Sequence, residues 1–100
     1  MKYWFTDIGT VNEGLFVEIT LDFAANVQLM DSPNFEKYKK LLEHEYIGGY
    51  IKFTPYTIRI PRDARWFVVV DLAGNPGQVR SSVAVLKEER KIKKKALPTL

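Results

Sequence analysis

LFVEITLDF, at residues 15–23, is the clearest β-strand pattern in this 100-residue chain. Side chains along a strand point alternately to opposite faces of a sheet, so every second residue shares a face. One face of this strand carries five apolar residues: Leu15, Val17, Ile19, Leu21 and Phe23. We therefore predict a strand with one buried face. The turn residues at 12–14 predict that it pairs, as a hairpin, with an earlier strand at residues 3–8.

A second strand, at residues 66–70, is apolar on both faces, which is typical of a central strand covered on both sides. The turn signal at residues 74–77 leads to a last strand at 79–86, and we expect these two strands to form a hairpin. Shorter strands are predicted at residues 27–30, 50–53 and 56–60. About seven short strands predict a mainly β protein, an antiparallel, jelly-roll-like β-sandwich with one short inserted helix.

The inserted helix is predicted to begin at Ser32, whose hydroxyl suits the N-cap, with Pro33 in the first helical position. Three apolar residues then follow at helical spacing and form one stripe: Phe35, Tyr38 and Leu42. We expect the helix to end near residues 42–45. The Gly-Gly pair at residues 48–49 is interpreted as a turn or a bulge.

Several segments resemble a bacterial domain of unknown function, family 1883, over residues 3–86. The most specific is the run Ala25-Asn26-Val27-Gln28-Leu29-Met30-Asp31, and Tyr46-Ile47-Gly48-Gly49 and Val69-Val70-Asp71-Leu72 add to it. The resemblance implies a small β-rich bacterial domain, found alone or fused to modules such as TIR-type domains, with no assigned activity. Relatives carry glycine where this chain has Leu41.

Charge divides the chain into two parts. Residues 1–86 hold nine Lys/Arg and ten Asp/Glu, whereas residues 87–100 hold six Lys/Arg and two Glu. Only one residue in nine is apolar over Lys87–Lys95, too few to bury a core. We therefore predict a β-sandwich domain at 1–86 and a basic, disordered tail at 87–100. Contact with nucleic acid is expected only through the Lys87–Lys95 tail.

Composition excludes several classes of site. The chain has no cysteine, which excludes disulfides, thiolate metal sites and a cysteine nucleophile. The longest apolar run, Trp66–Val70, is five residues, and a membrane helix needs about 20. With no signal-peptide pattern at its beginning, the chain is predicted to be cytoplasmic and without a membrane span. We expect no cofactor and no metal.

Polar residues concentrate in the loops around residues 22–34, where turn and cap chemistry is the simplest explanation. Their spacing departs from that of a calcium-binding EF-hand loop. Together with surface aromatic residues they make one candidate set for binding a protein partner or a small ligand: Asn26, Asp31, Asn34, Trp4, Tyr46 and Tyr50. Trp66, in the most apolar strand, is assigned to the core.

Three functions remain open. The leading one is a non-enzymatic binding or protein-interaction module, because the sequence shows no pairing of a nucleophile with a base and therefore no catalytic residues. The alternatives are an enzyme that uses Asp31, His44 or Asp71, and a protein that binds anionic surfaces through its tail. A homo-oligomer is also open, since sheet edges can pair between copies.

Overall fold

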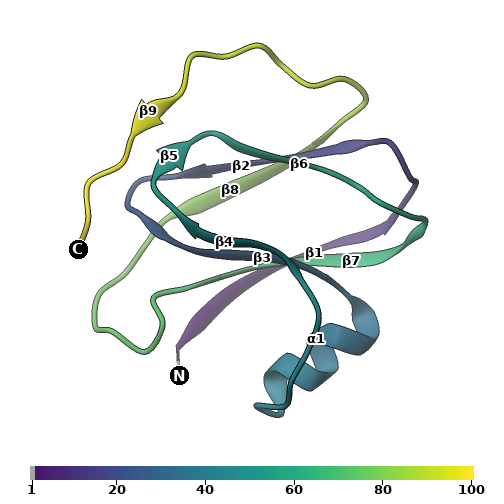
Figure 1. The fold of residues 1–100 in the computed structure, drawn as a ribbon, viewed down its shortest axis with the longest axis horizontal. Helices are drawn as coiled ribbons and strands as arrows, with labels where there is room; N and C mark the ends of the chain where they lie inside the picture. Colours follow the sequence, from purple (N-terminus) through teal and green to yellow (C-terminus); the bar gives the residue numbers. More distant parts are fainter. Residues whose placement is uncertain (1) are drawn as a thin grey trace.

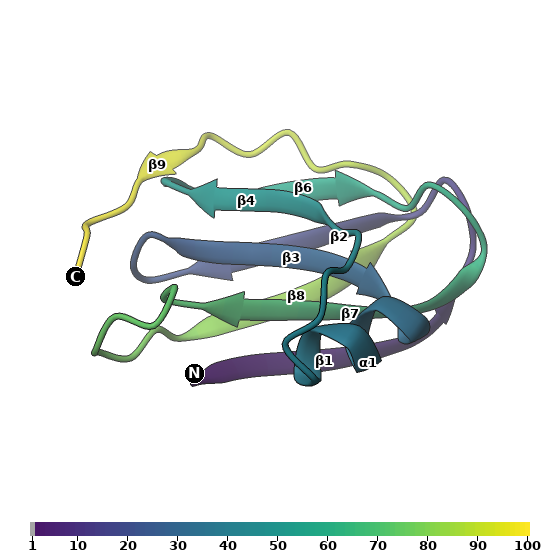
Figure 2. The same ribbon diagram turned by 60° about the horizontal axis from the view of Figure 1, so that its bottom comes forward.

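Two antiparallel sheets face each other in the computed structural model, which describes residues 2–100 (Figures 1 and 2). The larger sheet has the order β1 (Tyr3–Val11), β7 (Ala64–Asp71), β3 (Ala25–Asp31) and β4 (Ile47–Ile51). The smaller sheet has the order β6 (Tyr56–Arg59), β2 (Phe16–Leu21) and β8 (Ser81–Leu86). A short pair joins β5 (Phe53–Thr54) to β9 (Lys95–Ala96). The predicted mainly β sandwich with one short helix is confirmed.

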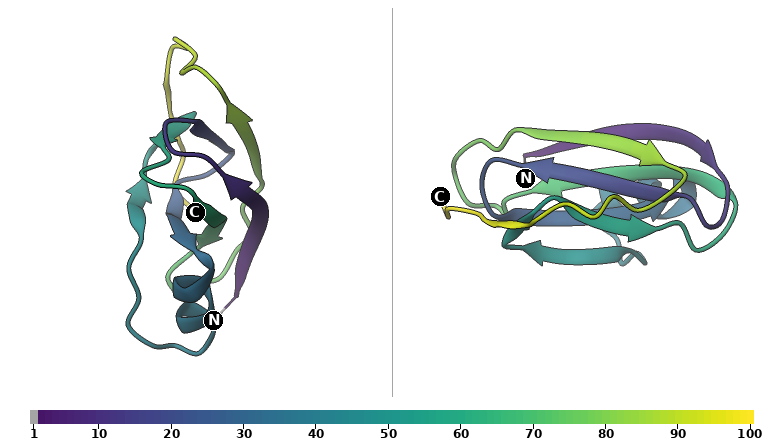
Figure 3. Two further views of the ribbon diagram at one scale, coloured as in Figure 1. Left: turned by 90° about the vertical axis from the view of Figure 1, so that its right-hand side faces the viewer. Right: turned by 90° about the horizontal axis from the view of Figure 1, so that it is seen from above.

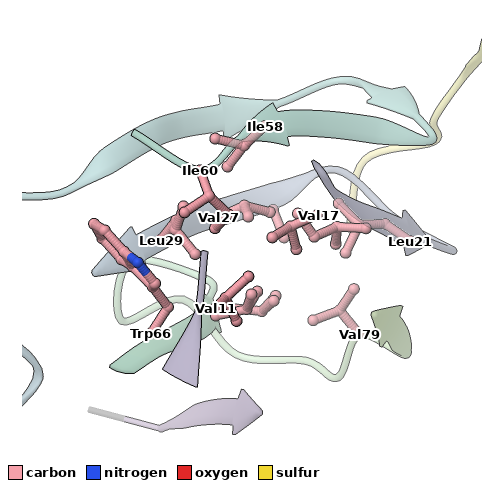
Figure 4. Close-up of a cluster of buried hydrophobic side chains, with 13 residues drawn as sticks. Val11, Val17, Leu21, Val27, Leu29, Ile58, Ile60, Trp66 and Val79 are labelled. Carbon is pink, nitrogen blue, oxygen red and sulfur yellow. The ribbon is translucent and has the colours of Figure 1, made fainter. Parts of the chain in front are cut away.

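The main core lies between the two sheets (Figure 4). Val17 and Ile19 of β2 are fully buried there, and Leu21 is nearly so, which confirms the buried face predicted for this strand. They face apolar residues of β3, among them Val27 and Leu29. Burying a side chain of this size contributes about 1.5–3 kcal/mol relative to leaving it in water.

β7 is covered on both faces, as its two-sided apolar pattern predicts. Trp66, Val68 and Val70 contribute to the core between the sheets. Phe67 and Val69 point the other way, into a second cluster under α1 (Ser32–Lys39). The helix lies on the outer face of the larger sheet (Figure 2).

Both predicted hairpins are wrong. β1 pairs with β7 and β2 pairs with β6 and β8, so the first two strands lie in different sheets. β7 and β8 are likewise in different sheets. Turn residues show where the chain reverses, but the reversal can lead into the facing sheet as well as to a neighbouring strand.

The helix begins and ends slightly earlier than predicted. Asp31, not Ser32, is its N-cap, and the Asp31 side chain accepts a hydrogen bond from the backbone N–H of Asn34. The helix ends at Lys39, and Leu41 follows with a φ of +60°, a left-handed conformation that favours glycine. Leu42 therefore lies outside the helix and is exposed.

Gly48-Gly49 lies inside β4 and is not a turn. Gly48 has a φ of +135°, and a Cβ atom there would lie 2.0 Å from the carbonyl oxygen of Val27. The glycine therefore permits an approach of β4 to β3 that no other residue allows.

Residues 87–100, predicted from the sequence to be a basic, disordered tail, run along the outside of the domain in the structure (Figure 3). This segment, which we name the C-terminal strap, passes over the outside of the smaller sheet (Figure 3). Its Arg90 forms an ion pair with Glu18 of β2, and Leu97 packs against the core. Apolar residues return after Lys95 and give the strap's end a place to pack.

Within residues 2–100, no helix has both the length and the apolar character needed to cross a membrane.

Candidate functional site

A hollow of about 210 Å³ opens beside the first residues of β4. Its walls come from the end of β3, the first turn of α1, the segment that leads into β4, and the loop between β6 and β7. Its polar and aromatic lining includes Asp31, Asn34, Glu45, Tyr46, Arg62 and Trp66. Small-molecule sites usually enclose about 300–1,000 Å³, so this hollow suits a single side chain better than a whole ligand.

Asp31 organises the hollow. Its Oδ1 atom accepts hydrogen bonds from the backbone N–H of Asn34, at 3.2 Å, and from Asn34 Nδ2, at 2.7 Å. Its Oδ2 atom pairs with the Arg62 guanidinium. Burial acts to raise the pKa of Asp31, but the bonds from Asn34 and Arg62 outweigh burial and hold that pKa below its ordinary value. Asp31 is therefore a carboxylate at neutral pH.

Arg62 is presented on a rigid aromatic support. Its guanidinium carbon lies 5.1 Å from the ring centroid of Trp66, and Trp66 Nε1 donates to the Arg62 carbonyl at 3.1 Å. Trp66 is buried, as the sequence predicts, whereas the Arg62 side chain is 56% exposed. A guanidinium fixed in this way keeps N–H groups free for a carboxylate or a carbonyl oxygen from outside.

Asn34 connects the helix to the segment before β4. While its amide nitrogen bonds Asp31, its Oδ1 atom accepts a hydrogen bond from the backbone N–H of Glu45 at 2.8 Å. The position of Glu45 and Tyr46 on the wall of the hollow is therefore set by the first turn of α1. Tyr46 itself is about half exposed.

A separate buried network surrounds Asp71. Asp71 Oδ1 accepts from Asn26 Nδ2, at 3.0 Å, and from the backbone N–H of Ala73, at 2.9 Å. Asp71 Oδ2 accepts from the Tyr38 hydroxyl at 2.7 Å. Burial, together with this bond to Asp71, raises the pKa of Tyr38 well above its ordinary value. The network ties the end of α1 to the larger sheet.

The predicted site residues fall into three places. Asp31, Asn34 and Tyr46 meet in the hollow beside β4. Asn26 and Tyr50, neighbours across β3 and β4, line another hollow near residues 72–76. Trp4 lines a third beside β1 and packs against the core between the sheets.

Sequence reasoning missed Arg62 and Glu45. Arg62 lies in a loop after Pro61, and Glu45 precedes β4, so no periodic pattern marks either residue. One local signal could have pointed to Arg62: it directly follows a loop proline and lies four residues before the buried Trp66. The indole N–H of Trp66 donates to the Arg62 carbonyl.

The three residues considered for catalysis do not share this hollow. Asp31 lines it, whereas His44 and Asp71 do not. His44 Nε2 lies 2.7 Å from Gln28 Oε1, and its ring packs against that of Tyr38 at 5.3 Å. Asp71 is only 3% exposed and its oxygens are taken by three donors.

β4 is the most exposed strand of the larger sheet and forms one of its edges. Of the ten large apolar side chains exposed among the described residues, four lie on β4 or directly beside it: Tyr46, Ile47, Tyr50 and Phe53. An exposed edge with such side chains offers both unpaired backbone groups and apolar contact area.

A family model described as "Domain of unknown function (DUF1883)" matches residues 1–89. No curated protein and no solved structure matches the chain.

Proposed function

The chain belongs to the DUF1883 family of domains of unknown function, and from its own geometry we propose that it is a non-enzymatic protein-interaction module that binds an extended segment along β4. The observation that carries the proposal is that the outer edge of β4 is unpaired among the described residues. Within residues 2–100, β3 pairs with one edge of β4 and no strand pairs with the other. An extended peptide can continue the sheet there through main-chain hydrogen bonds.

The hollow supplies specificity. It opens at the beginning of β4, and alternate side chains of an added strand point to the same face, so one of them can enter it. Arg62, Asp31 and Glu45 line that space, so a polar side chain of the partner finds both a cation and carboxylates there. Trp66 beneath Arg62 keeps the cation in place.

Two features favour binding over catalysis. The carboxylates of Asp31 and Asp71 already accept hydrogen bonds from neighbouring residues, and His44 contacts Gln28 rather than a nucleophile. General acid–base chemistry needs a group within hydrogen-bond reach of the reacting atom, and the hollow offers only carboxylates that are paired or on its rim.

A display screen of extended peptides tests the proposal. Peptides that bind should shift the backbone amide resonances of β4, and Tyr50→Lys should abolish their binding because a charge on an edge opposes strand addition. Val85→Lys is the matched control, since Val85 is also exposed on an edge strand, β8. Equal binding to both variants, or turnover of a substrate at the hollow, would contradict the proposal.

A second candidate function is binding of an anionic partner by the strap. Lys94 of the strap and Lys52 line a hollow together with the aromatic rings of Tyr50, Phe53 and Tyr56. Cations beside aromatic rings are typical of surfaces that bind nucleic acid or another polyanion.

Retention on heparin tests this second candidate. Replacing Lys93, Lys94 and Lys95 by alanine should lower the salt concentration needed for elution. The control replaces Lys37, Lys39 and Lys40, which are on or next to α1, and removes the same charge. The same change in elution for both triple variants would rule the strap out as a specific site.

A further inference from the structure

We infer that the extended segment bound by β4 is β4 of a second copy of this chain, paired antiparallel about a two-fold axis. The two four-stranded sheets would then form one continuous sheet. This inference rests on the proposed function, because it names the partner that the open edge of β4 receives. A two-fold interface uses the same surface on both copies, so that surface must be complementary to itself.

The other sheet edges carry features that oppose pairing. β1 has a register shift between Asp7 and Gly9, and bulges of this kind interrupt an edge ladder. β6 contains Arg59 and is flanked by prolines at positions 55 and 61. β8 lies between Arg80 and Lys87, so antiparallel self-pairing would place cations opposite cations.

β4 has none of these features. Its five residues, Ile47–Ile51, include no charge, no proline and no register shift in its pairing with β3. Natural proteins usually protect a free edge with such features, so their lack on β4 indicates an edge that is covered in the functional state.

Charge at the two ends of β4 is opposite in sign. Glu43 and Glu45 precede the strand, Lys52 follows it directly, and Lys95 lies opposite Thr54 in the β5–β9 pair. When the strand pairs antiparallel with itself, the acidic end of each copy lies opposite the basic end of the other. The two-fold axis repeats this attraction, and attraction at both ends fixes the antiparallel direction.

The centre of β4 suits close pairing. Gly48 and Gly49 have no side chains to separate the strands, and Tyr46, Tyr50 and Phe53 provide exposed aromatic surface on either side. Tyrosine and phenylalanine are enriched in protein interfaces. The basic end of the second copy would lie beside Glu45 and Tyr46, which are also on the wall of the hollow.

A charge exchange tests the inference. Sedimentation of the full chain over a range of concentrations should show a monomer–dimer equilibrium that weakens as salt is added. Glu45→Lys alone and Lys52→Glu alone place like charges opposite each other and should each raise the dimer Kd by about tenfold or more. The double variant, Glu45→Lys with Lys52→Glu, restores opposite charges and should recover most of the affinity.

Two variants outside β4 serve as controls. Lys37→Glu on α1 and Val85→Lys on β8 should leave the dimer Kd unchanged. Glu45 and Lys52, the two residues exchanged, are both exposed, so their exchange leaves the core intact.

The outcomes separate this inference from the proposed function. A chain that stays monomeric while selected peptides still bind β4 would overturn the self-pairing and leave the interaction module standing. A dimer that Val85→Lys dissociates, or that neither single exchange weakens, would also overturn it. A monomer that binds no peptide at β4 would contradict both.

Discussion

The outer faces of the two sheets are covered in different ways. Over the larger sheet, α1 follows β3 directly in the chain and packs aromatic rings against β7, with Phe35 and Phe67 stacked at 4.3 Å. Over the smaller sheet, the C-terminal strap covers Glu18 with Arg90, 72 residues away, and leaves Glu18 only 4% exposed. The first cover is apolar and local in sequence, and the second is ionic and remote. They should therefore respond differently to mutation, pH and salt.

The largest effect is expected from Phe35→Ala in the apolar cover. Phe35 is buried between Phe67 and Tyr3, and its removal leaves a cavity under α1. We expect the free energy of unfolding in urea to fall by about 3–5 kcal/mol. Leu42→Ala is the control, since Leu42 is exposed beyond the helix and its loss should cost less than about 0.5 kcal/mol. Similar losses for both would mean that α1 does not seal this face.

The second largest effect is expected from the hydrogen bond between Tyr38 of α1 and Asp71 of β7. Tyr38→Phe keeps the ring but removes the hydroxyl that donates to Asp71. A buried carboxylate that loses one of its donors should cost about 1–3 kcal/mol in the same unfolding measurement. Tyr46→Phe, which removes a hydroxyl from an exposed ring, should change stability little. An equal effect of the two variants would show that the Asp71 network does not hold α1.

Alkaline pH should loosen the helix cover specifically. The pKa of Tyr38 is raised in the folded state by burial and by Asp71, so the unfolded chain ionises first, near pH 10. Tyr38 therefore stabilises the fold below pH 10, and this contribution is lost as pH rises through and beyond that value. In Tyr38→Phe, the free energy of unfolding should fall less steeply above pH 10 than in the wild type. Parallel curves would contradict this assignment.

The smallest effect on global stability is expected in the ionic cover. Arg90→Ala removes the partner of Glu18, and we expect a smaller loss of stability than for Tyr38→Phe, together with faster amide hydrogen exchange at Leu97. High salt should bring the wild type closer to the variant. Lys91→Ala, which removes a neighbouring charge, is the control. If Leu97 exchanges at the same rate in both variants, Arg90 does not hold the strap.

Acid should loosen the same ionic cover. The Arg90 side chain, through its hydrogen bonds, holds the pKa of Glu18 below its ordinary value. The pair therefore contributes fully above the ordinary pKa of a glutamate, near 4.5, and its contribution is lost as pH falls through the lower folded value.

What the sequence predicts well is what repeats along the chain. The alternation in β2 and the two-sided apolar run of β7 both report burial, and both are confirmed. The predicted helical stripe is confirmed for Phe35 and Tyr38 and is wrong for Leu42, which is exposed beyond the helix. Strand partners were not predictable from turns, because a turn into the facing sheet uses the same residues as a hairpin turn. The resemblance to family 1883 is confirmed as well, by the family model that matches residues 1–89.

The site was predictable only in part. Asp31 and Asn34 lie where cap chemistry starts α1, so local signals reach them. Arg62 and Arg90 act through ion pairs with residues 31 and 72 positions away, and such pairs leave no periodic mark in the chain. The same holds for Asp71, whose partners Asn26 and Tyr38 come from two other elements.

The central place of β7 also governs how the protein is made. β7 pairs with β1 on one side and with β3 on the other, yet it is synthesised after both. Until Ala64–Asp71 has left the ribosome, β1 has no strand to pair with. The apolar faces of β2 and β3 also lack the β7 side chains that complete the core between the sheets. A nascent chain that has not yet reached residue 64 therefore exposes apolar surface, and the larger sheet can form only after β7 has been synthesised.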